Sequence, residues 1–133
     1  MNKISAITAF LGAVRNRYID YQPDKTLREK LECAAQIKGL DGVEVCYPAD
    51  FADVGLLKSL LAEYGLSVSG INFRSRRNDR WWRGSFTSED PSERADLIND
   101  MKKAMDLALE LGCDRISTCP LNDGHDYVFE LDY

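Results

Sequence analysis

Residues 39–45 read Gly-Leu-Asp-Gly-Val-Glu-Val, and this stretch decides the fold, because it joins the end of a helical pattern to a short apolar strand. The same junction returns at 65–71 as Gly-Leu-Ser-Val-Ser-Gly-Ile and at 112–117 as Gly-Cys-Asp-Arg-Ile-Ser. A glycine just after a helix adopts the left-handed conformation that turns the chain out of the helix. Strands that alternate with amphipathic helices form βαβ units, so the sequence predicts an α/β fold with parallel strands.

Working outward from these junctions, the apolar pattern predicts four strands, at 4–10, 42–47, 67–73 and 114–119. A polar loop is expected at 15–25. A second, longer loop at 74–90 is of a length that is usually functional or disordered in compact domains, and its two Trp and one Phe argue against disorder.

Three helices are expected between the strands. The first begins with the capping box Thr26-Leu-Arg-Glu29, and the third begins at Asp90-Pro-Ser-Glu93 and runs to about Leu111. Helical spacing predicts one buried stripe on each. The three stripes are Leu27, Leu31, Ala34 and Ala35; Val54, Leu57, Leu61 and Tyr64; and Ile98, Met101, Met105 and Ala108.

Two architectures fit this count of elements. A doubly wound sheet usually carries a glycine-rich phosphate loop after its first strand, but residues 10–15 contain one glycine. A (βα)8 TIM barrel is typically about 250 residues long, and this chain has 133. We expect residues 1–133 to form one TIM-barrel domain, truncated before strands five to eight: about three βα units plus strand four.

Composition narrows the function classes. The net charge of -5 argues against non-specific binding of nucleic acid. No apolar stretch is long enough to span a bilayer, and no signal peptide begins the chain. The four cysteines form no Cys-x-x-Cys pair, which favours reduced thiols and a cytoplasmic location over a metal cluster.

Parallel sheets concentrate their chemistry at the carboxyl ends of the strands. Phe10, Tyr47, Asn72 and Arg74 stand at or near the ends of the first three predicted strands, and we take them as candidate substrate-binding residues. For Tyr47, packing at the barrel rim is the alternative. Glu44 lies inside the second strand, where it faces either the barrel interior or the helices.

The loop 74–90 holds five arginines interleaved with two tryptophans, a combination that can grip a phosphate and stack on a sugar. Trp81 and Phe86 are its candidate substrate-binding residues, and packing on the rim or on a partner subunit is the alternative. After strand four, Asn122 and Asp123 can bind sugar hydroxyls or simply form a turn. His125, the single histidine, is a candidate substrate ligand or acid–base group, or a cap of the next helix.

Residues 81–90, Trp-Trp-Arg-Gly-Ser-Phe-Thr-Ser-Glu-Asp, followed by Arg94 and by Met-Asp-Leu-Ala-Leu-Glu-Leu-Gly at 105–112, resemble xylose isomerase. The resemblance covers roughly residues 40–127 and indicates the wider xylose isomerase-like TIM-barrel superfamily. In xylose isomerase a His and acidic residues end strand two and a Trp wall follows strand four. This chain has Cys-Tyr-Pro-Ala-Asp at 46–50 and about Cys119 there, which favours a relative acting on another sugar.

The resemblance implies a sugar or sugar-phosphate isomerase or epimerase that uses a divalent metal (Mn, Mg, Co or Zn). The family's metal ligands lie on strands five to eight, so no metal ligand is expected in this chain, and its catalytic residues stay unassigned. The chain would supply the substrate wall and be inactive alone. Its expected partners are a small-molecule sugar or sugar phosphate and further copies of itself, with neither nucleic acid nor a membrane.

Two alternatives remain. An endonuclease IV-like, metal-dependent phosphodiesterase belongs to the same superfamily, but it relies on several His ligands and this chain has one His. The other alternative is a non-catalytic, four-stranded α/β module that binds a sugar.

Overall fold

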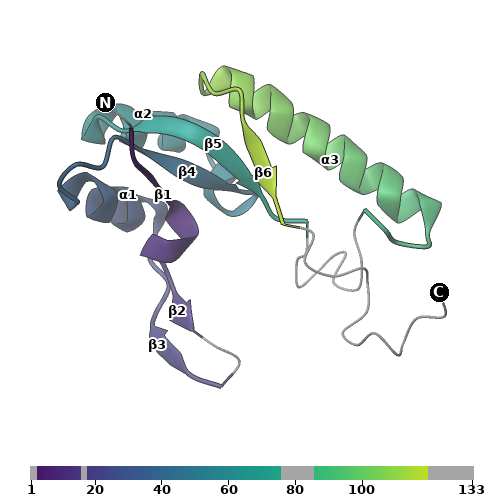
Figure 1. The fold of residues 1–133 in the computed structure, drawn as a ribbon, viewed down its shortest axis with the longest axis horizontal. Coiled ribbons are helices and arrows are strands. Elements are labelled where there is room, and N and C mark those ends of the chain that lie inside the picture. The colour runs from purple at the N-terminus through teal and green to yellow at the C-terminus, as the bar shows by residue number, and fades with distance from the viewer. Residues whose placement is uncertain (1–2, 16–17, 76–85, 120–133) are drawn as a thin grey trace.

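A four-stranded parallel sheet with three helices forms the body of the protein (Figure 1). The computed structural model describes residues 3–15, 18–75 and 86–119. The sheet order is β1-β4-β5-β6, with bounds Ser5–Ile7, Gly42–Tyr47, Ser67–Phe73 and Ile116–Thr118. The helices between these strands are α1 (Leu27–Gln36), α2 (Val54–Tyr64) and α3 (Pro91–Glu110).

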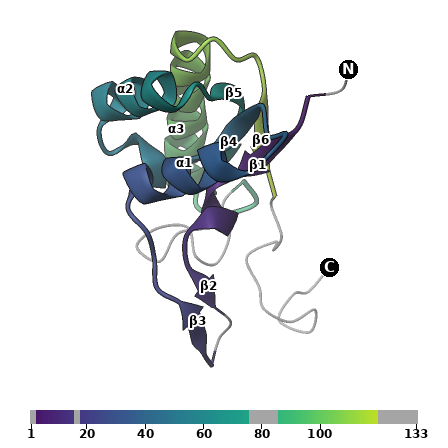
Figure 2. The same ribbon diagram turned by 90° about the vertical axis from the view of Figure 1, so that its left-hand side faces the viewer.

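The strand order follows the order of the chain, and the three helices gather on one side of the sheet (Figure 2). A doubly wound sheet would reverse its order and carry helices on both faces. One-sided winding is the arrangement of a TIM barrel, in which helices surround the strands. The structure therefore confirms an α/β fold consistent with part of such a barrel.

The core lies between the sheet and the helices. Val43, Val45 and Ile71 are completely buried, and they pack with Leu57 and Leu60 of α2. Because side chains alternate along a strand, the residues between them lie on the face that no helix covers. That helix-free face corresponds to the interior of a closed barrel.

The junction glycines behave as the sequence predicts. Gly39, Gly65 and Gly112 have φ values of 86°, 65° and 71°, which is the left-handed region. Gly42 serves a different purpose: a Cβ added there would lie 2.3 Å from the backbone oxygen of Ser67. The close approach of β4 and β5 at their first residues therefore requires a glycine.

Both predicted helix starts are confirmed. The hydroxyl of Thr26 accepts from the Glu29 amide at 3.3 Å, and the Glu29 carboxylate accepts from the Thr26 amide at 2.7 Å. The carboxylate of Asp90 accepts from the amide of Ser92 at 2.8 Å, with Pro91 in the first turn. These caps fix where α1 and α3 begin.

The first predicted strand, 4–10, is too long. β1 ends at Ile7, and Thr8–Leu11 form a 3-10 helix, η1. The loop predicted at 15–25 contains part of a short antiparallel hairpin, β2 (Val14–Arg15) and β3 (Asp20–Gln22), which projects from the body (Figure 1). A further 3-10 helix, η2 (Ala49–Phe51), follows β4.

The predicted buried face of α3 is partly wrong: Ala108 is buried and Met101 packs partly buried against the core, as predicted, but the other two positions are displaced by one residue. Ile98 and Met105 are about half exposed, whereas Leu97 and Ala104 are buried completely. Asp100, on the same face, accepts a 3.0 Å hydrogen bond from the hydroxyl of Tyr47 on β4. This polar contact, with the small Ala104, sets the rotation of the helix. On α1, Leu31 and Ala34 are buried as predicted, but Ala35 is exposed.

Candidate functional site

A pocket of about 640 Å³ opens at the carboxyl ends of β1, β4 and β5. Its walls come from η1, the hairpin, α1, η2 and the residue after β5. The residues that line it include Phe10, Asp24, Lys30, Cys46, Asp50 and Arg74. The volume lies within the range of about 300–1,000 Å³ that is usual for small-molecule sites.

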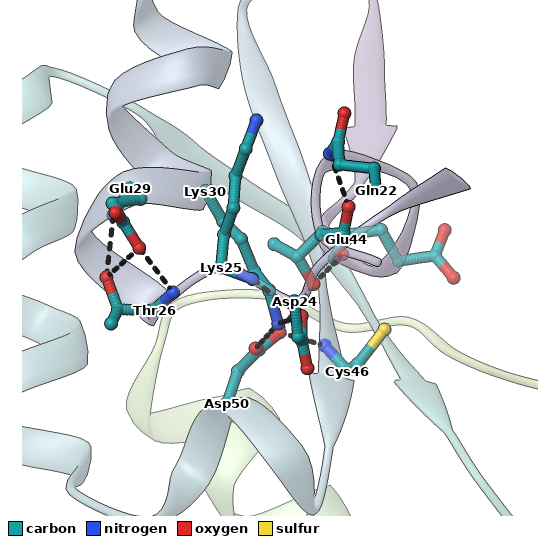
Figure 3. Close-up of polar contacts among 11 residues, drawn as sticks. Gln22, Asp24, Lys25, Thr26, Glu29, Lys30, Glu44, Cys46 and Asp50 are labelled. Carbon is teal, nitrogen blue, oxygen red and sulfur yellow. Dashed lines mark hydrogen bonds and ion pairs between the residues drawn. The ribbon is translucent and has the colours of Figure 1, made fainter. Parts of the chain in front are cut away.

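Asp50 is a buried carboxylate in the wall of this pocket, and contacts from three segments hold it in place. Its side chain is 2% exposed, and its Oδ2 accepts from the Thr8 hydroxyl at 2.5 Å and from the Cys46 amide at 2.8 Å. The second oxygen, Oδ1, lies 3.9 Å from Nζ of Lys30 (Figure 3). A buried carboxylate needs such partners, and here η1, β4 and α1 each provide one.

Lys30 reaches from α1 into the pocket, where its side chain is 12% exposed. Its Nζ lies 3.5 Å from Oδ1 of Asp24, a carboxylate that is 65% exposed. Partial burial acts to raise the pKa of Asp24, but the Lys25 amide and the charge of Lys30 outweigh it and hold that pKa below its ordinary value of 3.8. Figure 3 shows the Lys30 ammonium between the two aspartates.

Phe10 and Arg74, both predicted as substrate-binding residues, line this same pocket. Phe10 is 74% exposed, an unusual position for a phenylalanine ring, and Arg74 follows directly after β5. An exposed ring beside cationic groups can stack on the C–H face of a sugar while the cations bind an anionic substituent.

Asn72 does not line the pocket but lies on the helix-free face of β5. Its Nδ2 donates to Glu44 Oε1 at 2.9 Å and to Ser117 Oγ at 3.1 Å. The hydroxyl of Ser117 donates to the same Glu44 oxygen at 2.5 Å. Glu44 therefore faces the barrel-interior side, and its partners are an amide and a hydroxyl of the next two strands.

Tyr47 and Phe86 lie with the packed core. Tyr47 is 9% exposed, its ring stacks on Phe73 at a centroid distance of 5.5 Å, and its hydroxyl donates to Asp100. Phe86 packs partly buried against the same cluster. Neither lines the pocket formed by Phe10 and Arg74.

Four predicted site residues fall outside the described residues: Trp81, Asn122, Asp123 and His125. Lys30, Asp24 and Asp50 are the pocket residues that the sequence reasoning missed as site candidates. Asp50 stands three residues after a strand end, which was a usable signal. Lys30 offered none, because a lysine between the apolar positions of an amphipathic helix is indistinguishable from a surface residue.

The described residues do not fit a divalent metal. Within residues 3–15, 18–75 and 86–119, no three or more His, Cys, Asp or Glu side chains come together as ligands. The two pocket carboxylates, Asp24 and Asp50, flank the ammonium of Lys30, which occupies the position that a cation would take.

Comparison of the sequence with known proteins and protein families shows the family to which the chain belongs. No curated protein matches the chain. In the described part of the chain, no helix combines the length and apolar character needed to cross a bilayer. A family model described as "xylose isomerase-like TIM barrel" matches residues 31–130, which is most of the chain. With its one-sided parallel sheet and its pocket at the strand ends, the chain belongs to the xylose isomerase-like TIM barrel family.

Proposed function

We propose that this chain is the substrate-binding part of a sugar or sugar-phosphate isomerase or epimerase. The observation that carries the proposal is the pocket at the carboxyl ends of β1, β4 and β5, which the exposed ring of Phe10 lines together with Lys30 and Arg74. In a barrel of this family, that end is where substrates bind.

Each group has a defined task in this proposal. Phe10 stacks on the C–H face of the sugar, and the cations hold an anionic substituent or hydroxyl oxygens. The polar row of Glu44, Asn72 and Ser117 faces the barrel interior, where it orients hydroxyl groups of a substrate that extends inward.

A divalent metal in such an enzyme would polarise the carbonyl and hydroxyl oxygens of the substrate. The described residues do not form a site for it, and we derive no step through it. We propose that its ligands lie on later strands of a complete barrel, so that this chain binds a sugar without converting it. Conversion of an aldose to a ketose by this chain alone, followed by ¹³C NMR, would contradict this division.

Saturation-transfer NMR against a panel of aldoses, ketoses and their phosphates tests the binding role. We expect Phe10→Ala to weaken binding about tenfold, because an aromatic contact contributes about 0.5–1.5 kcal/mol beyond the area it buries. The matched control is Leu109→Ala on α3, where the side chain is 74% exposed and outside the pocket. The proposal fails if no member of the panel binds, or if both variants bind like the parent chain.

A further inference from the structure

Lys30 has two carboxylate neighbours that differ in how firmly they are held. Asp50 is buried and fixed by the Thr8 hydroxyl and the Cys46 amide, so it is a permanent counter-ion. Asp24 is 65% exposed and lies in the connection between β3 and α1. Because the Asp24 carboxylate is mostly in contact with solvent, it is the neighbour of the ammonium that an anionic ligand can replace.

The Lys30–Asp24 contact packs closely over Gly12. A Cβ at that position would lie 2.7 Å from Asp24 Oδ1 and 2.7 Å from Lys30 Cε. Any larger residue would displace the two groups from each other. The absence of a side chain at residue 12 thus lets Lys30 and Asp24 come together at the wall of the pocket.

We propose that Lys30 is an anion-binding residue, and that Asp24 occupies its place until a phosphate or carboxylate group of the ligand replaces it. The inference rests on the proposed function in one respect, since the ligand is taken to be a sugar derivative. Arg74 lines the same pocket and supplies a second cation, and Phe10 supplies the apolar face. A phosphorylated or carboxylated sugar matches this combination.

If Asp24 competes with the ligand for Lys30, removing the charge of Asp24 should raise the affinity for an anionic ligand rather than lower it. Removing a residue that merely lines a site weakens binding, whereas removing an internal competitor strengthens it. Asp24→Asn keeps the shape of the side chain and removes its charge. A gain that comes from competition needs the Lys30 ammonium and should be absent from the double variant Lys30→Met/Asp24→Asn, whereas a general charge effect should persist there.

Isothermal titration with inorganic phosphate, D-xylulose and D-xylulose 5-phosphate provides the test. We expect the phosphate ester to bind more tightly than the neutral sugar, and Lys30→Met to remove that preference by lowering ester affinity about tenfold. Asp24→Asn should raise ester affinity about threefold. The matched control, Lys58→Met, removes a lysine paired with Glu110 beside the start of β5 and should change neither.

The possible results separate failure of this inference from failure of the proposed function. If Lys30→Met does not fold, Asp24→Asn alone gives the answer, because unchanged or weaker ester binding overturns the inference. Equal binding of ester and neutral sugar, insensitive to either variant, also overturns it and leaves the proposed function intact. If no sugar binds at all, the inference and the proposed function fail together. Binding of inorganic phosphate without the ester would assign Lys30 to a free anion and reject the sugar derivative.

Discussion

The hydroxyl of Thr8 donates a 2.5 Å hydrogen bond to Oδ2 of Asp50, and this contact joins the turn after β1 to the turn after β4. The two residues are 42 positions apart in the chain. Through Asp50 the contact also reaches the ammonium of Lys30. One buried carboxylate therefore holds together the three segments that shape the pocket.

We expect Asp50→Ala to lower the free energy of unfolding by about 2–4 kcal/mol, because it removes the buried carboxylate that accepts from the Thr8 hydroxyl and the Cys46 amide and that lies beside the largely buried Lys30 ammonium. Thermal unfolding followed by circular dichroism measures the change. Asp106→Ala, on the exposed side of α3, is the control and should change it by less than about 0.5 kcal/mol. Equal effects of the two substitutions would refute the role assigned to Asp50.

The capping box of α1 makes stability depend on pH. The Thr26 amide, and then its hydroxyl, hold the pKa of Glu29 below its ordinary value of 4.5. A carboxyl whose pKa is lower in the folded state stabilises above its unfolded pKa and loses this effect as the pH falls through the folded pKa. At pH 7 the protein should therefore have a higher Tm than Glu29→Gln.

That difference in Tm should shrink as the pH drops below 4.5. Glu32→Gln removes the same charge from the same helix without touching the capping contact, and serves as the control. A difference between Glu29→Gln and the parent that stays constant from pH 7 to pH 2.5 is the result that this explanation cannot accommodate.

Gly42→Ala should destabilise the fold by about 1–3 kcal/mol, since its Cβ would overlap the backbone oxygen of Ser67 and force β4 and β5 apart. Gly55→Ala is the matched control, because its Cβ would meet only a side-chain oxygen of Asp53 at 3.3 Å. The control should stay within about 1 kcal/mol of the parent chain. Urea unfolding compares the two, and an unaffected Gly42→Ala would show that the strands do not approach as closely as described.

Local signals predicted much of the fold. The bounds of β4 and β5 match the predicted 42–47 and 67–73, because glycine junctions and apolar runs mark them. The face of α3 was predicted only in part, since Ile98 and Met105 form as good a stripe as Leu97 and Ala104. The choice between them depends on contacts with β4 and β5, which are distant in sequence.

The sequence predicted less of the candidate site than of the fold. Arg74 directly follows β5, as predicted, whereas Phe10 lies in η1, because β1 ends at Ile7 rather than at residue 10; both line the pocket. Tyr47 ends β4 as predicted, but its side chain lies on the core side. A strand's last residue can face either side of the sheet, and the sequence alone does not say which. Asp50 has a local signal, three residues after the end of β4, whereas Lys30 becomes recognisable only when α1 folds against β4 and brings the two charges together.

The central claim is that ligands bind at the carboxyl ends of β1, β4 and β5. Amide chemical-shift mapping by ¹H–¹⁵N NMR, with D-xylulose 5-phosphate added to the ¹⁵N-labelled chain, tests it most directly. The account predicts the largest shifts at Gly12, Cys46, Asp50 and Arg74. Shifts centred instead on Leu66, Ser67 and Gly112, at the opposite end of the sheet, or no shifts at any concentration, would contradict it.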